Sequence, residues 1–219
     1  MKFFLILLLC LIAFPVFAAT VPHDTMEWTR MWTDHANSKD LPRVLMIGDS
    51  ICNGYRDYTQ KELEGKVYVD QLVSSRALDQ EYYWKQLELP FMEQKYDLIL
   101  FNFGLHGFHI GFEDYGKGLE KLADFLKTKS SNLCFVLTTP MDYMSGDKTA
   151  IEINAKVIKR NEVAKKVMSE KGIKIFDLYT PIDGKSDIRA GNKDYYHYNE
   201  AGKKYQAKIV SEKIIELLK

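Results

Sequence analysis

Two short motifs near opposite ends of the chain contain residue types suited to nucleophilic chemistry. A Gly-Asp-Ser motif ends at Ser50, and an Asp-Tyr-Tyr-His motif runs from Asp194 to His197. A serine hydroxyl is a weak nucleophile until a base removes its proton, and histidine is the usual base near neutral pH. An aspartate three residues before a histidine can hold one ring nitrogen, which leaves the other free to accept a proton. Each motif alone has a structural alternative, a helix N-cap for Ser50 and a solvated loop histidine for His197.

The elements that must position these motifs are short apolar runs alternating with amphipathic stretches. Continuous apolar runs predict five strands, at residues 43–47, 66–69, 98–102, 133–138 and 173–177. Apolar residues at helical spacing predict three helices between and after them, and residues 79–89 fit a further helix. The three stripes are Tyr115, Leu119, Leu122 and Leu126; Ile153, Val157, Ala164 and Met168; and Ala207, Val210, Ile214 and Leu217.

This β-α-β-α alternation predicts an α/β fold, with a parallel sheet between two layers of helices. In such sheets, ligands bind at the carboxyl ends of the strands. Ser50 follows the first predicted strand, and we expect His197 in a loop after the fifth. The two motifs therefore fall on the same edge of the sheet, which favours a shared catalytic role.

The pair of motifs resembles the SGNH/GDSL hydrolases, over residues 43–219. This resemblance implies a three-layer α/β/α sandwich with a five-stranded parallel sheet of flavodoxin-like order. Matched position by position, it implies Ser50 as nucleophile, His197 as base and Asp194 as the residue that orients His197. It also implies hydrolysis of an ester or thioester through an acyl-enzyme, with no metal or organic cofactor. The continuation from His197 through Asn199 to Gly202 matches the family as well.

The chain departs from the family where a Gly-x-Asn block normally supplies an oxyanion-hole amide. Here the sequence is Gly104-Leu105-His106, which resembles a branch of the family with a G-L-H pattern. A neutral imidazole has one N–H donor, so His106 can replace the amide; the alternative is a structural loop histidine. We expect Asp49, Gly104 and His109 to contribute to the substrate pocket.

A second departure concerns the glycine whose backbone N–H normally joins the oxyanion hole. No glycine follows the second predicted strand, where the sequence is Val73-Ser74-Ser75-Arg76-Ala77. A backbone N–H does not require glycine, so Ser75 or Arg76 is expected to supply it. Arg76 alternatively binds an acidic substrate group or pairs with a surface carboxylate.

Three further features have structural interpretations. We expect Cys134, inside a predicted strand, to be a buried free thiol, and we do not expect Cys52 to act as the nucleophile. The aromatic residues 82–84 favour helix packing over a carbohydrate platform. Residues 141–144, after the fourth predicted strand, are expected to form part of the pocket wall.

The N-terminal residues 1–18 have the pattern of a secretory signal peptide. Lys2 is their only charge, an apolar run follows, and Ala18 stands at the expected cleavage position. An uncleaved membrane anchor is the alternative. The whole chain has 30 basic and 30 acidic residues. Cleavage would leave 29 basic and 30 acidic residues, a formal net charge of −1, which argues against a nucleic-acid partner.

The function predicted from these observations is that of a secreted or periplasmic serine esterase, with residues 19–219 as one SGNH hydrolase-like domain. The first substrate choice is an O-acetyl ester on a carbohydrate. The alternatives are a lysophospholipase- or thioesterase-type acyl hydrolase, and a non-catalytic carbohydrate-binding module on the same fold. The expected partner is a small-molecule or carbohydrate ester, with no stable membrane insertion after cleavage. The oligomeric state is left open.

Overall fold

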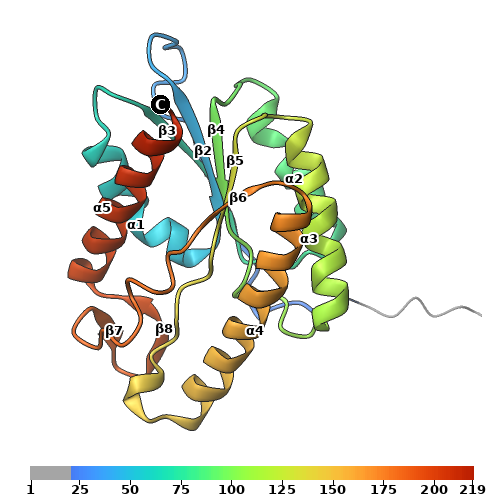
Figure 1. Ribbon diagram of the computed structural model, residues 1–219, viewed down its shortest axis with the longest axis vertical. Helices are drawn as coiled ribbons and strands as arrows, with labels where there is room; N and C mark the ends of the chain where they lie inside the picture. The colour runs from blue at the N-terminus through green and yellow to red at the C-terminus, as the bar shows by residue number, and fades with distance from the viewer. Residues whose placement is uncertain (1–20) are drawn as a thin grey trace, which may run out of the picture.

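The computed structural model describes residues 21–219, and its centre is a sheet of six strands (Figure 1). The strand order is β1-β3-β2-β4-β5-β6, and every neighbouring pair except β1 and β3 is parallel. From edge to edge the strands are β1 (Thr29–Trp32), β3 (Tyr68–Ser74), β2 (Arg43–Gly48), β4 (Leu98–Phe101), β5 (Leu133–Val136) and β6 (Lys174–Phe176). The five parallel strands have the flavodoxin-like order that the family resemblance implied.

Strand β1 is an antiparallel addition that the sequence analysis did not predict. It pairs with β3 so that Thr29 lies opposite Ser74 and Trp32 opposite Gln71. Its two central residues are exposed, so it lacks the continuous apolar run that marks the buried strands. The pairing brings the preceding residues 21–28 to the carboxyl end of β3.

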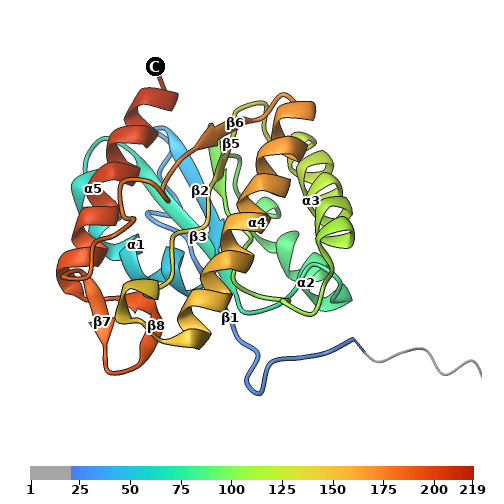
Figure 2. The same ribbon diagram turned by 60° about the horizontal axis from the view of Figure 1, so that its bottom comes forward.

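Helices cover both faces of the sheet, which confirms the three-layer α/β/α architecture (Figures 1 and 2). On one face, α1 (Ser50–Glu62) packs against α5 (Glu200–Leu217). On the other lie α2 (Glu81–Leu87), α3 (Phe112–Lys127) and α4 (Lys148–Glu170), with the 3-10 turns η1 (Leu89–Phe91) and η2 (Tyr143–Ser145) in the connections. The four predicted stripe residues of α3 are all buried against the sheet.

The Asp-Tyr-Tyr-His motif lies in a strand rather than in the expected loop. Strand β7 (Arg189–Gly191) pairs antiparallel with β8 (Asp194–Tyr198), and this hairpin packs beside α1. The two turn residues, Asn192 and Lys193, have φ values of 53° and 63°. Positive φ at both central residues is what a tight hairpin turn requires, so the hairpin holds the motif more rigidly than an open loop would.

The predicted signal peptide, residues 1–18, lies outside the described residues. Within residues 21–219, no helix is both long and apolar enough to cross a bilayer.

Candidate active site

The structure joins Ser50, His197 and Asp194 in one hydrogen-bonded chain. Ser50 Oγ lies 2.9 Å from His197 Nε2, although 147 residues separate them in sequence. On the other side of the ring, Nδ1 lies 2.8 Å and 3.0 Å from the two carboxylate oxygens of Asp194. A ring nitrogen within hydrogen-bond reach of a hydroxyl, with a carboxylate on the opposite nitrogen, is the arrangement that can remove a serine proton.

Ser50 is positioned by the turn from β2 into α1. Gly48 is required there, because a Cβ at this position would lie 2.6 Å from the Cβ of Cys52. Asp49 caps the helix by accepting a hydrogen bond of 2.9 Å from the Ile51 N–H. Ser50 is the first residue of α1, where backbone N–H groups have no partner inside the helix and the helix dipole is positive. Its N–H is therefore suited to bind an oxyanion.

His197 is positioned by local hydrogen bonds within and after β8. Asp194 Oδ1 accepts the backbone N–H groups of Tyr196 and His197 at 3.1 Å and 3.0 Å. Asn199 then caps α5 by accepting from the Gly202 N–H at 3.0 Å. Burial raises the pKa of Asp194, but the hydrogen bonds from His197 and Tyr196 outweigh burial and lower it below its ordinary value. Asp194 is therefore an anion at neutral pH.

Ser50 and His197 open onto a cavity of about 260 Å³, and His106 lines the same cavity. The His106 imidazole accordingly shares a space with the serine, as the sequence predicted. Its Nδ1 lies 3.0 Å from Asp24 Oδ2, whereas its Nε2 is buried without a hydrogen-bond partner among residues 21–219. Asp24 itself is a cavity residue that the sequence analysis missed, and the remaining wall is formed by Leu105, Gly107, Phe108 and Tyr196.

Arg160 holds the loop that carries His106, and this residue was also missed. Its side chain is only 1% exposed, in the middle of α4. The guanidinium donates to the carbonyl oxygens of Gly104 at 3.1 Å and of His106 at 2.7 Å, and it also bonds to that of Gly107. The signal was an arginine inside the apolar stripe of a predicted helix, in the gap between Val157 and Ala164.

The two backbone N–H groups predicted as oxyanion donors after β3 already donate hydrogen bonds to other groups of the protein. The Ser75 N–H donates to the Trp28 carbonyl at 3.0 Å, which continues the β1–β3 pairing. The Arg76 N–H donates to the Ser74 hydroxyl at 3.2 Å, and the Arg76 guanidinium stacks on Tyr82. The prediction that Ser75 or Arg76 supplies an oxyanion donor is therefore wrong for this structure, because the segment before β1 accepts the first N–H and the Ser74 hydroxyl accepts the second.

The three predicted pocket residues Asp49, Gly104 and His109 do not line the cavity around Ser50. Asp49 is a buried helix cap. Gly104 faces Thr138, and a Cβ there would lie 1.8 Å from the threonine Oγ1, so the glycine serves close packing. His109 Nε2 lies 2.7 Å from Asp79 Oδ2 in a separate, partly exposed pair.

Of the remaining sequence predictions, some are confirmed by the structure and others are not. Cys52 and Cys134 are both buried free thiols, and burial raises their pKa values to about 12 and about 11, which makes them poor nucleophiles. Tyr83 is buried in the core and Trp84 packs against the core, as expected for helix packing, whereas Tyr82 is exposed. Residues 141–144 do not line the cavity. The described residues contain no cluster of three or more potential metal-ligating side chains.

Comparison with known proteins gives a clear result at the level of the fold. No family model and no curated protein matches the sequence. Among solved structures, a lipase/acylhydrolase from Enterococcus faecalis is similar at a TM-score of 0.64 and 17% identity, over 82% of this chain and 98% of that chain. A proposed SGNH hydrolase from Slackia heliotrinireducens is similar at a TM-score of 0.59 and 17% identity, over 80% and 100% of the two chains.

An acetylxylan esterase from Geobacillus stearothermophilus is also similar, at a TM-score of 0.61 and 15% identity, over 81% of this chain and 94% of that chain. The protein therefore has the SGNH hydrolase fold, as the resemblance of its motifs implied. Its hydrogen-bonded serine, histidine and aspartate lie where such a fold gathers side chains, at the carboxyl ends of the parallel strands.

Proposed function

We propose that this protein is an exported serine esterase that removes small acyl groups, with O-acetyl groups on carbohydrate as the substrate class. One observation carries the proposal: Ser50 Oγ lies 2.9 Å from His197 Nε2 beside a cavity, and the opposite ring nitrogen is held by Asp194. Export is proposed from the signal-peptide pattern of residues 1–18.

The proposed reaction has two acyl-transfer steps. Ser50 Oγ attacks the acyl carbon while His197 Nε2 takes the hydroxyl proton, and the carbonyl electrons move onto the oxygen. The tetrahedral intermediate collapses, and His197 returns the proton to the departing alcohol. Water then attacks the acyl-enzyme with His197 again as the base, which releases the acid and restores Ser50. The Asp194 carboxylate stabilises the imidazolium in both steps.

The proposed substrate class is supported by the dimensions and the lining of the site. A cavity of about 260 Å³ has room for a small acyl group and part of its alcohol. Phe108 and Tyr196 lie in its wall and offer aromatic surface for the alcohol part. One protein of similar fold is an acetylxylan esterase, which is consistent with a carbohydrate ester.

The activity is tested with a series of 4-nitrophenyl esters from acetate to decanoate, using wild type, Ser50→Ala and the control Ser186→Ala. Ser186 is an exposed serine in the segment before β7. We expect the highest kcat/KM at acetate, no activity above background for Ser50→Ala, and wild-type activity for Ser186→Ala. Equal hydrolysis by wild type and Ser50→Ala would refute the proposed mechanism.

The substrate class is tested separately, by acetate release from acetylated xylo-oligosaccharides. Acetate release that requires Ser50 supports the carbohydrate proposal. A rate maximum at eight carbons or more in the ester series would instead indicate a lipase-type acyl hydrolase. Binding of the oligosaccharide without any hydrolysis would indicate a binding module on the same fold.

A further inference from the structure

A second aspartate–histidine pair lies in the cavity that contains Ser50. The Asp24 carboxylate lies 3.0 Å from His106 Nδ1, and both residues line the cavity wall with Ser50 and His197. His106 comes from the loop after β4. Asp24 comes from residues 21–28, here called the N-terminal strap, which lead into β1. The two pairs therefore reach one cavity from distant parts of the chain.

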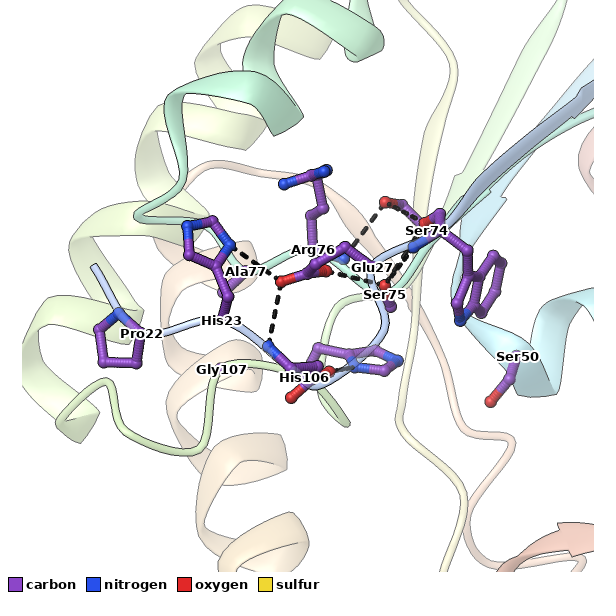
Figure 3. Close-up of polar contacts among 12 residues, drawn as sticks. Pro22, His23, Glu27, Ser50, Ser74, Ser75, Arg76, Ala77, His106 and Gly107 are labelled. Atoms are coloured by element: carbon purple, nitrogen blue, oxygen red, sulfur yellow. Dashed lines mark hydrogen bonds and ion pairs between the residues drawn. The ribbon is translucent and has the colours of Figure 1, made fainter. Parts of the chain in front are cut away.

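The strap is fixed in place mainly through Glu27. This carboxylate accepts from the Asp24 N–H at 3.1 Å, from Gln80 Nε2 at 3.0 Å and from Ser75 Oγ at 2.9 Å. The next residue, Trp28, donates its N–H to Ser75 Oγ at 2.9 Å. Figure 3 shows the strap passing between the segment from Ser74 to Ala77 and the loop of His106 and Gly107. Asp24 is therefore held at a defined position.

The strap also changes which groups can stabilise an oxyanion. It occupies the Ser75 N–H through the Trp28 carbonyl, so the edge of β3 offers no free donor at that residue. The candidate donors left near Ser50 are its own N–H and the His106 ring. The His106 Nε2 is buried and has no partner within residues 21–219, and Figure 3 shows the ring extending toward the side where Ser50 lies.

The number of N–H groups on the His106 imidazole decides whether it can donate to Asp24 and to an oxyanion at once. A neutral ring has one N–H, whereas a doubly protonated ring donates from both nitrogens. In the transition state, His106 would lie between the Asp24 carboxylate and the developing oxyanion, two negative acceptors on opposite sides of the ring. Hydrogen bonds between a charged donor and a charged acceptor are the strong ones.

We propose that Asp24 is a positioning residue for the oxyanion site. It accepts the Nδ1–H of a doubly protonated His106 ring and so orients the Nε2–H toward the oxyanion that forms when Ser50 attacks. No proton moves to or from His106 in this step, because the serine proton goes to His197. The proposal rests on the esterase function proposed above, and it assigns a catalytic contribution to the N-terminal strap.

The test is a double-mutant cycle on 4-nitrophenyl acetate with Asp24→Asn, His106→Ala and both together. We expect Asp24→Asn to lower kcat by roughly 10- to 100-fold with little change in KM, less than the about 100- to 1,000-fold typical of losing an oxyanion donor. In the His106→Ala background, Asp24→Asn should cause almost no further loss, because Asp24 acts through His106. Asp24→Glu should restore part of the activity.

A matched control is available in the same region of the protein. Asp79 pairs with His109 at 2.7 Å outside the cavity, so Asp79→Asn removes a comparable aspartate–histidine contact and should keep wild-type kcat. Wild-type kcat in Asp24→Asn, or an equal fold-loss in both backgrounds, would overturn the proposal. If Ser50→Ala were as active as wild type, the esterase function itself would fail, which is a distinguishable outcome.

Discussion

Two aspartate–histidine pairs flank one cavity, and they are built in different ways. Asp194 and His197 lie three residues apart in one hairpin strand, and the same carboxylate also accepts two backbone N–H groups. Asp24 and His106 lie 82 residues apart and meet only because the strap packs beside the loop after β4. The first pair is a local motif. The second is a product of the tertiary fold, and its aspartate is 55% exposed.

Because of this difference, we expect substitutions in the two pairs to have different effects on catalysis. In the proposed mechanism the local pair carries the proton of the reaction, so breaking it should remove the chemical step. The long-range pair orients a donor, so breaking it should weaken stabilisation of the transition state and leave the base in place. Variants of each pair should therefore separate these roles, with the greater losses at the local pair.

Breaking the local pair should have the largest effect. His197→Ala is expected to lower kcat by at least about 10,000-fold, and Asp194→Asn by about 10,000-fold, because the ring loses its orientation and the charge that stabilises it. Single-turnover kinetics on 4-nitrophenyl acetate measure both losses. An Asp194→Asn variant within tenfold of wild type would remove Asp194 from the mechanism.

Removing the donor of the long-range pair should cost less. His106→Ala is expected to lower kcat by about 100- to 1,000-fold, the usual loss for one oxyanion donor. His106→Asn provides an amide donor at the same position and should recover part of that loss. Identical activities for the alanine and asparagine variants would argue against a donor role for His106.

Loosening the loop that carries His106 should act on both activity and stability. Arg160→Met leaves the carbonyl groups of Gly104, His106 and Gly107 without their buried donor. Each unsatisfied buried acceptor costs about 1–3 kcal/mol, so urea unfolding should show a clear loss of stability. The kcat of the folded fraction should fall by about tenfold. Unchanged kcat and stability would show that Arg160 does not hold the loop.

The smallest predicted effect concerns the anchor of the strap. Burial raises the pKa of Glu27, but its hydrogen bonds from Gln80, Ser75, Asp24 and His23 outweigh burial and lower the pKa below the ordinary value. A lowered pKa in the folded state means that ionised Glu27 stabilises the fold above the ordinary carboxyl pKa. This contribution is lost as the pH falls through the folded-state pKa.

Glu27→Gln should therefore reduce the free energy of unfolding by about 1 kcal/mol at pH 7, with a smaller difference from wild type as the pH falls toward 3. Urea unfolding of both proteins across this pH range measures the difference. A difference that stays constant with pH would mean that the Glu27 charge does not hold the strap.

The contrast between local and long-range contacts also explains what could be predicted from the sequence. The parallel sheet and the helices α3, α4 and α5 were predicted, because continuous apolar runs and helical stripes report burial directly. Residues 79–89 fitted α2, whereas no such stripe was identified for α1. The Asp194–His197 pair was visible because its two residues are close in sequence. Asp24 was not, because nothing in the residues near it points to a partner after β4. β1 was missed for a related reason, since Arg30 and Met31 are exposed and leave no apolar run.

Arg160 shows an intermediate case. It was not predicted, although its position within an apolar helical stripe was a signal, and the sequence did not show that three loop carbonyls would surround it. The predicted donor at Ser75 is wrong because the strap accepts its N–H through the Trp28 carbonyl, and the predicted donor at Arg76 is wrong because the Ser74 hydroxyl accepts its N–H. Local chemistry was therefore predictable, whereas contacts made by added edge segments required the structure.

The proposed mechanism depends on Ser50 being a nucleophile activated by His197. The most direct test treats wild type and His197→Ala with a fluorophosphonate and maps the modified residue by peptide mass spectrometry. We predict one phosphonyl group per wild-type molecule, located on Ser50, and almost none on His197→Ala under the same conditions. Absence of label at Ser50 in the wild type, or equal labelling of the two proteins, would contradict the account.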